Sequence, residues 1–283
     1  MNNNTLEQTQ KPNGHYAPIH GLELYYEIHG EIHGEQKPLI LLHGGLGSTE
    51  MFADPLPLLS SSRQVIGVDL QAHGRTADID RPLSLESMGD DIAALIQHLG
   101  LGQANLMGYS LGGMAALQTA IRHPETVRRL VVVSIPFKRN GWFPEVLEGM
   151  KGVRAEAAEM MRPSPVYQTY ARNAPRPQDF PKLLEKVGQM LGHDYDYTEG
   201  VQTLKMPVLV VAGDTDSLSP AHAAEFFGLL GGGKQDAGWD GSGITCRSRL
   251  AILPNTTHYN SFASPLLVPI VTDFLNAPMP EFR

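Results

Sequence analysis

Short apolar runs alternate with longer segments of helical periodicity along most of the chain. The runs at 38–42, 104–109 and 127–133 are continuous, as expected for strands that are covered on both faces of a parallel sheet. Segments with helical spacing, at 85–99 and 111–123, lie between or after these runs. The alternation predicts an α/β fold with a mostly parallel central sheet and flanking helices.

Different patterns predict the two ends of this sheet. Near the start, the runs at 16–19 and 22–28 flank a His-Gly turn, and the second run alternates apolar and polar positions, which favours an antiparallel pair at one sheet edge. Near the end, apolar runs at 207–212 and 250–253 resume the α/β rhythm, each followed by a helical segment. We therefore expect both halves of the chain to contribute to one sheet.

A helical insertion is predicted between the two halves. Residues 137–203 contain helical stretches, such as 153–161 and 183–190, and no clear strand. A second irregular segment, 231–248, holds six glycines and little apolar content, which is typical of a surface excursion.

Composition and charge exclude several classes of function. The 283 residues include 22 basic and 30 acidic side chains, a net charge of −8, without any basic cluster larger than a pair, so a nucleic-acid partner is not expected. The apolar runs fall far short of the ~20 residues of a membrane helix, so we expect no membrane insertion. Because Cys246 is the single cysteine and the opening residues lack the pattern of a secretory signal, we expect a cytoplasmic protein without disulfides.

The pentapeptide Gly-Tyr-Ser-Leu-Gly at 108–112 is the sharpest chemical feature. It lies between an apolar run and a helical segment rich in small residues. A serine at such a strand-to-helix reversal has a strained backbone, and its neighbours must be small so that strand and helix can approach closely. Gly108, Gly112 and Gly113 meet this need, which favours Ser110 as a nucleophile over an incidental serine at a glycine-rich helix start.

A serine hydroxyl is a weak nucleophile unless a histidine base and an orienting acid accompany it. Two aspartates follow the predicted strand at 207–212. We choose Asp216 as the acid. Asp214 is the alternative, although an aspartate at such a position more often forms a turn. His258 follows the last predicted strand in a polar loop. It completes the chain order Ser, Asp, His that this architecture favours.

The remaining histidines are expected to have other roles. His98 and His123 lie at predicted helix ends and His222 on a predicted helix, so we expect surface or capping positions for them. His193 has two aspartates nearby, but a solvated polar stretch is favoured over a metal site there. We therefore predict neither a metal nor a cofactor.

Backbone amides are the expected donors to a developing oxyanion. The amide of Leu111, which follows the candidate nucleophile, should be one donor, and the amide of Gly45 or of Leu46 the other. A phosphate-binding loop is the alternative interpretation of His43-Gly44-Gly45. It is discounted because the chain has no GxGxxG that opens a helix and no Lys-Ser/Thr pair there.

Together these motifs resemble the α/β-hydrolase superfamily over nearly the whole chain. The His-Gly-Gly sequence at 43–45, the Asp-Leu-Gln-Ala-His-Gly stretch at 69–74, the turn at Ser110, the Gly-Asp-Thr-Asp loop that ends at Asp216 and the loop of His258 occur in the family's order. The resemblance implies that Asp216 is the acid of the triad. Serine at 110, where related dehalogenases and epoxide hydrolases have aspartate, implies an acyl-enzyme instead of their chemistries.

The same resemblance assigns the insertion. Residues 137–203 resemble the helical cap that follows the sixth strand, and residues 1–136 and 204–283 then form the core domain. Ala72 stands where such proteins often have glycine, so a different turn is expected there. Side chains that either line an apolar pocket or pack the cap onto the core are Trp142, Phe143, Met150, Met160 and Met161.

The predicted function is hydrolysis of a carboxylic ester, thioester or lactone by Ser110, His258 and Asp216 through an acyl-enzyme. Cleavage of a carbon–carbon bond or perhydrolysis by the same triad is the alternative, and a non-catalytic receptor for a small ligand is a further one. Because only 18% of residues are charged and no basic pocket motif is present, we expect a small neutral or apolar acyl substrate. A homodimer is compatible with the sequence, which identifies no interface.

Overall fold

In the computed structural model, which describes residues 13–34, 36–241, 243 and 246–279, the described strands form one eight-stranded sheet in the order β1-β2-β4-β3-β5-β6-β7-β8. β2 is antiparallel to both its neighbours, β1 and β4, and all other neighbouring strands are parallel. The predicted mostly parallel sheet with an antiparallel pair at one edge is thus confirmed. The strands are β1 Asn13–Ile19, β2 Leu22–His29, β3 Leu39–Leu42, β4 Val65–Val68, β5 Ala104–Tyr109, β6 Val127–Val133, β7 Val208–Thr215 and β8 Arg249–Thr257.

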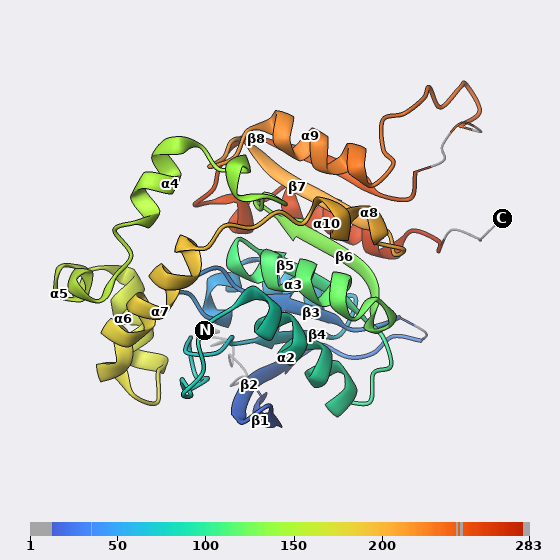
Figure 1. The fold of residues 1–283 in the computed structure, drawn as a ribbon. Coiled ribbons are helices and arrows are strands. Elements are labelled where there is room, and N and C mark those ends of the chain that lie inside the picture. The colour runs from blue at the N-terminus through green and yellow to red at the C-terminus, as the bar shows by residue number, and fades with distance from the viewer. Residues whose placement is uncertain (1–12, 35, 242, 244–245, 280–283) are drawn as a thin grey trace, which may run out of the picture.

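Helices cover both faces of the sheet (Figure 1). Apolar side chains of α2, α3 and α9 belong to one buried cluster, and those of α1 and α10 to a second cluster on the opposite face. The bounds of these helices are α1 Pro55–Ser60, α2 Leu85–His98, α3 Leu111–Arg122, α9 Pro220–Leu229 and α10 Leu267–Asn276.

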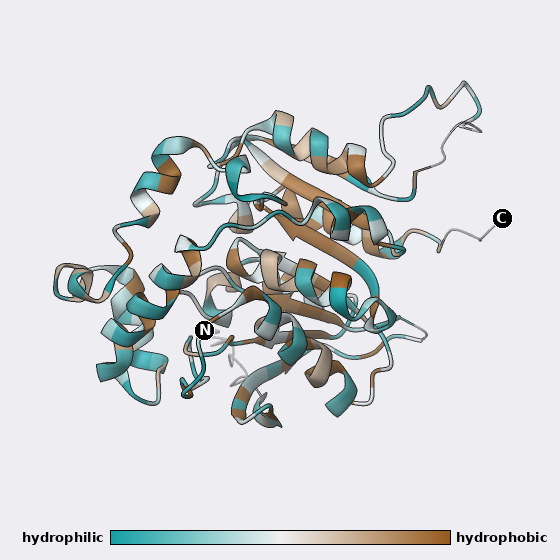
Figure 2. Cartoon of the chain, viewed as in Figure 1, coloured by the Kyte–Doolittle hydropathy of each residue, from teal (hydrophilic) through white to brown (hydrophobic). Residues whose placement is uncertain are grey.

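β6 shows why the central strands are continuous apolar runs. Leu130 and Val132 belong to the first cluster, whereas Val131 and Val133 belong to the second, because successive side chains of a strand point to opposite faces. All four side chains are fully buried. Figure 2 shows the central strands in brown between helices that carry teal residues outward.

Local signals place the helix ends. The side chain of Ser84 accepts a hydrogen bond from the Ser87 amide at 3.1 Å, which caps the first turn of α2 as its position before the helical segment indicates. The predicted helix at 153–161 is wrong over its first half: a 3₁₀ turn at Ala155–Ala157 precedes a single turn, α5 Ala158–Met161. Arg154, which precedes the 3₁₀ turn, has an extended backbone with a φ of −160° and a ψ of 163°, so helical backbone begins only after it.

The insertion between β6 and β7 is helical, as predicted. Figure 1 shows α4, α6 and α7 beyond one end of the sheet. Lys186 of α7 lies 2.8 Å from Asp78, and Arg172 of α6 lies 2.6 Å from Glu50, so ion pairs join these helices to the loops that follow β4 and β3. The helices of the insertion are α4 Pro144–Met150, α5, α6 Pro165–Asn173, α7 Phe180–Gly192 and α8 Thr198–Thr203.

Two further observations complete the fold. Ala72 itself adopts a φ of 66°, so alanine here has the left-handed backbone that a glycine would adopt more readily. Over the described part of the chain, every helix is too short or too polar to cross a membrane.

Candidate active site

Ser110 lies at a sharp turn between β5 and α3. Its φ of 50° and ψ of −119° fall in a region that residues other than glycine rarely adopt. The turn depends on close backbone approach, because a Cβ at Gly108 would lie 2.1 Å from the carbonyl oxygen of Gly112, and one at Gly112 would lie 2.4 Å from that of Leu42. The strand-to-helix geometry predicted for the pentapeptide is therefore present, and it holds the Ser110 hydroxyl at the carboxyl end of the sheet.

The structure brings the three predicted triad residues together. The Ser110 Oγ lies 3.1 Å from Nε2 of His258, and Nδ1 of His258 lies 2.9 Å from Oδ1 of Asp216. His258 directly follows β8 and Asp216 directly follows β7, so parallel strands deliver all three side chains to the same sheet edge.

Asp214, the alternative acid, points elsewhere. It lies within β7, and its carboxylate accepts hydrogen bonds from the amides of Asn255 and Thr256, both at 3.0 Å. These bonds connect the ends of β7 and β8. The geometry therefore gives Asp214 a backbone-bonding role and leaves the contact with His258 to Asp216.

Buried hydrogen bonds hold Asp216 in its charged form. Burial alone would raise its pKa, but the bonds from His258, the Gly213 amide at 3.0 Å and the Ser134 hydroxyl at 2.5 Å outweigh burial, and the pKa lies below its usual range. The amide of Ser217 adds a fourth donor at 2.7 Å. A fixed carboxylate can both orient an imidazole and stabilise its positive charge.

Two aromatic residues contact His258, the candidate base. The Tyr109 hydroxyl donates to the carbonyl oxygen of His258 at 2.8 Å, and the Trp142 ring stands edge-on to the imidazole at 5.5 Å between centroids. Burial raises the pKa of Tyr109, so its hydroxyl stays protonated and available as a donor.

Leu111, Gly45 and Leu46, whose amides are the predicted oxyanion donors, all line the pocket that contains Ser110. Leu111 is the first residue of α3, where helix amides have no partner within the helix. Gly45 and Leu46 line the same pocket as Ser110, and Leu46 has a φ of 59°. Among the residues that the structure describes, none accepts a hydrogen bond from these three amides.

The buried His43 bonds to the loop that contains Gly45 and Leu46. Nδ1 of His43 lies 2.7 Å from the Gly44 carbonyl oxygen, and its Nε2 accepts the Leu70 amide at 3.1 Å, which assigns the proton to Nδ1. Burial lowers the pKa of His43 to about 4, so the ring is neutral at physiological pH.

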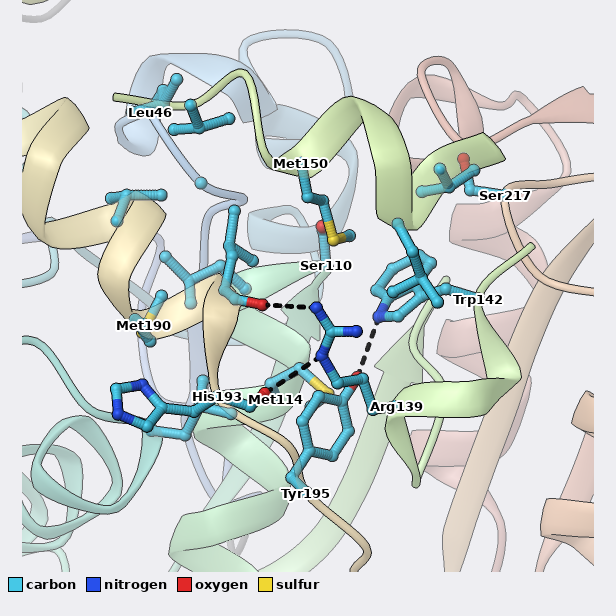
Figure 3. A pocket seen from close by; sticks show the side chains of 18 of the residues that line it. Leu46, Ser110, Met114, Arg139, Trp142, Met150, Met190, His193, Tyr195 and Ser217 are labelled. Carbon is cyan, nitrogen blue, oxygen red and sulfur yellow. Dashed lines mark hydrogen bonds between the residues drawn. The ribbon is translucent and has the colours of Figure 1, made fainter. Parts of the chain in front are cut away.

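A pocket of about 1190 Å³ opens above Ser110 (Figure 3). Trp142 and Met150 line it, as the sequence allowed, together with side chains of α7 such as Met190. The other candidates do not: Phe143 and Met160 are 38% and 79% exposed, because they lie on outward faces of the insertion. Met161 is also absent from the lining and packs against the core instead.

Among the other histidines, one expectation was wrong. His222 is buried, not at the surface: its ring stacks on Phe137 at 4.4 Å, and its Nε2 accepts the Phe137 amide at 3.3 Å. His98 is exposed, and His123 bonds Asp90 at 2.7 Å where α3 ends. Within the described ranges no three His, Cys, Asp or Glu side chains are grouped as metal ligands, and His193 lines the pocket.

Sequence reasoning missed three side chains: Ser134 and Tyr109 contact Asp216 and His258, and Arg139 lines the same pocket. Ser134 has one sequence signal, since it is the polar residue directly after the apolar run of β6. Tyr109 lies inside the pentapeptide, but its contact with His258 joins positions 149 residues apart. Arg139 lines the pocket, whereas the sequence shows it only as one member of the basic pair Lys138-Arg139.

Comparison with known proteins decides the family. A model described as the alpha/beta hydrolase fold matches residues 37–194. The chain belongs to this family. The putative carbamate hydrolase RutD of Caulobacter sp. (strain K31) is 29% identical over 248 residues, which span 78% of this chain and 90% of that protein.

Two further comparisons differ in how much of the chain they cover. A proline iminopeptidase of Clostridium botulinum (strain Hall) is 37% identical over 123 residues, 42% of each chain. The crystal structure of the enol-lactonase from Burkholderia xenovorans LB400 covers 93% of this chain and 100% of its own, with a TM-score of 0.68 and 23% identity, which shows the shared fold.

Proposed function

We propose that this alpha/beta hydrolase is a serine hydrolase that cleaves a carboxylic ester, thioester or lactone through an acyl-enzyme. One observation carries the proposal. The hydroxyl of Ser110 lies 3.1 Å from His258, whose other ring nitrogen lies 2.9 Å from a buried Asp216, at the floor of a mostly apolar pocket. This is the arrangement that nucleophilic catalysis by serine requires.

The reaction proceeds in two steps. Nε2 of His258 takes the Ser110 proton as the oxygen attacks the substrate carbonyl, and Asp216 stabilises the imidazolium. The amides of Leu111 and of Gly45 or Leu46 bind the oxyanion. The C–O or C–S bond then breaks, His258 protonates the departing alkoxide or thiolate, and water activated by the same histidine releases the acid from Ser110.

The substrate binds between two parts of the chain. We propose that residues 1–136 and 204–283 form the core domain and that 137–203 form a cap over the pocket. Met150 of α4 and Met190 of α7 support this assignment, since both line the wall above Ser110. A small acyl compound with an apolar body suits that wall. A cytoplasmic location and a homodimer stay predictions.

Carbon–carbon cleavage and perhydrolysis use the same residues, so the choice of substrates decides between them. The name enol-lactonase of one fold neighbour supports including a lactone in the first panel, and the name carbamate hydrolase of one relative supports including a carbamate. A vinylogous diketone, and acetate with peroxide, test the alternatives. A non-catalytic receptor would bind a member of this panel without turnover.

The test compares wild type with Ser110→Ala on methyl, thio- and cyclic esters. Removal of the nucleophile should lower turnover by several orders of magnitude with the fold intact, because the triad acts as a unit. Ser61→Ala, at an exposed serine directly after α1, is the matched control and should behave as wild type. Unchanged turnover in Ser110→Ala would overturn the assignment.

A further inference from the structure

The proposed active-site pocket contains a fixed cation in a largely apolar wall. Arg139 follows β6 and begins a short 3₁₀ turn, Arg139–Gly141, and its side chain lines the pocket. Figure 3 shows its guanidinium among Met150, Trp142 and Tyr195. The proposed catalytic chemistry gives this charge no role.

Two backbone carbonyls bind the guanidinium of Arg139. Nε of Arg139 donates to the carbonyl oxygen of His193 at 3.2 Å, and Nη2 donates to that of Leu191 at 3.1 Å (Figure 3). A guanidinium has five N–H groups, so both on Nη1 and one on Nη2 are left for another acceptor. No carboxylate of the described residues forms an ion pair with Arg139.

This cation and the candidate base are joined through shared neighbours. The Arg139 amide donates to the Tyr195 carbonyl oxygen at 2.9 Å, and the Tyr195 hydroxyl accepts the indole N–H of Trp142 at 2.8 Å. The ring of Trp142 in turn stands 5.5 Å from that of His258. Arg139 and Ser110 both line this pocket, so one small molecule bound there has access to both residues.

We propose that Arg139 binds a carboxylate at the end of the substrate remote from the scissile carbonyl. The proposal rests on the hydrolase function above and names its substrate class: acyl compounds that carry one free carboxylate, such as half-esters of dicarboxylic acids. Arginine is always charged, and its planar fork of N–H groups matches the two oxygens of a carboxylate. The neutral, apolar substrate predicted from the sequence then describes the middle of the molecule, and the end remote from the scissile carbonyl carries the carboxylate.

Three acidic side chains also line this pocket. Glu145 and Asp194 are exposed, and the carboxylate of Asp194 accepts the Tyr195 amide at 3.0 Å. Glu86 accepts the hydroxyl of Tyr197 at 3.2 Å. A cationic substrate held by these carboxylates is the competing possibility. A purely structural role for Arg139, as a cation at the carboxyl end of α7, is another.

Three matched methyl esters separate these possibilities. Monomethyl adipate carries a carboxylate, dimethyl adipate is neutral, and methyl 6-aminohexanoate carries an ammonium group. For wild type at neutral pH, we expect kcat/KM for monomethyl adipate to exceed that for dimethyl adipate by roughly 10- to 100-fold, the range of a hydrogen bond to a charged group. Half-esters from succinate to suberate should show one preferred length, because Ser110 and Arg139 fix the two ends.

The variant Arg139→Gln should reduce the ratio of the two kcat/KM values to near one, chiefly through KM for the half-ester, and Arg139→Lys should restore part of it. Arg154→Gln, at an exposed arginine of the same insertion, is the matched control and should keep the wild-type ratio. If Arg139 only supports α7, Arg139→Gln should lower kcat/KM equally for the half-ester and the diester. The wild-type ratio of the two values would then persist, which would overturn the proposal. A wild type without preference, or one that prefers the amino ester, would overturn it as well.

A binding experiment separates failure of the carboxylate site from failure of the proposed hydrolase function. If wild type cleaves none of the esters, calorimetric binding of monomethyl adipate to Ser110→Ala still tests the site. We expect binding that weakens at least tenfold when Arg139→Gln is added to Ser110→Ala, against no such change for dimethyl adipate. Equal binding of the half-ester by both proteins would reject the carboxylate site independently of any turnover.

Discussion

Tyr109 donates a hydrogen bond from its hydroxyl to the main-chain carbonyl oxygen of His258, at 2.8 Å. The two residues lie 149 positions apart, yet each is adjacent to or part of the proposed catalytic machinery, because Tyr109 immediately precedes Ser110. The bond joins the turn that carries the nucleophile to the loop that carries the base. Their relative position, on which the 3.1 Å contact between Ser110 and His258 depends, is thereby fixed.

Removal of this hydroxyl should loosen the base. In Tyr109→Phe the His258 carbonyl keeps only the Ser261 hydroxyl, at 3.3 Å. We expect kcat to fall roughly tenfold with little change in KM, and the free energy of unfolding to fall by about 1 kcal/mol. Steady-state kinetics and urea unfolding measure the two effects.

Tyr170→Phe is the control for this change, since Tyr170 is a buried tyrosine of α6 whose hydroxyl bonds no described residue. It should leave kcat at the wild-type value. A wild-type kcat in Tyr109→Phe would show that the loop of His258 is held by its other contacts alone.

Substitution of Asp216 should affect chiefly activity, and substitution of Asp214 chiefly stability. Asp216→Asn removes the carboxylate that orients His258 and should lower kcat by up to ~10⁴-fold, since the amide favours the wrong tautomer of the imidazole. Asp214→Asn should instead lower the thermal midpoint, because it weakens bonds to the Asn255 and Thr256 amides, and change kcat only a few-fold. If Asp214→Asn caused the larger loss of kcat, the acid would be misassigned.

Stability should fall in mild acid because of two buried histidines. The rings of His43 and His73 lie 5.2 Å apart, and burial lowers the pKa of His43 to about 4 and that of His73 to about 3. The unfolded chain binds protons at these residues near pH 6.5, whereas the folded chain does not, so the free energy of unfolding decreases as pH falls from about 7 toward 4. Each histidine should contribute about 2 kcal/mol to this loss at pH 5.

Urea unfolding at about pH 7 and pH 5 measures this dependence. His73→Asn is the informative variant because an asparagine N–H can replace Nδ1–H of His73, which lies 2.8 Å from the Gln71 carbonyl oxygen. The difference in free energy between the two pH values should then shrink by about half. An unchanged difference would place the acid sensitivity elsewhere in the molecule.

The sequence predicted what is local in this protein. Continuous apolar runs identify buried parallel strands because both faces of such strands are covered, and the glycines around Ser110 reflect a close approach between neighbouring elements. The order Ser110, Asp216, His258 follows from where those strands end.

Contacts between distant segments could not be predicted in the same way. The burial of His222 depends on Phe137, 85 residues earlier, and a single helical residue gives no sign of such a partner. Arg139 is one member of a basic pair with Lys138, and nothing local in the sequence indicates that the fold brings it to the pocket. The helix expected over 153–161 was wrong over its first half because apolar periodicity does not show that Arg154 takes an extended backbone.

One lysine should control how firmly the proposed cap is attached. Nζ of Lys186 lies 2.8 Å from both carboxylate oxygens of Asp78 and also donates to the carbonyls of Ile79 and Arg81. Lys186→Met should therefore accelerate amide hydrogen exchange in α6 and α7 while α2 and α3 keep their wild-type rates.

Lys182→Met provides the comparison, because Lys182 also pairs with Asp78, at 2.7 Å, but its side chain is 50% exposed and water screens the pair. Its effect on exchange should be smaller. Uniform acceleration across the sheet in Lys186→Met would indicate global destabilisation and argue against a cap that moves as a unit.

Trapping of the acyl-enzyme tests the central proposal most directly. Wild type is mixed rapidly with an activated short-chain aryl ester and quenched in acid, and its intact mass and peptide map are compared with those of Ser110→Ala and His258→Ala. We predict a burst of aryl alcohol and one added acyl group on the peptide that contains Ser110, absent from Ser110→Ala and strongly slowed in His258→Ala. An adduct at another residue, or undiminished turnover in Ser110→Ala, would contradict the account.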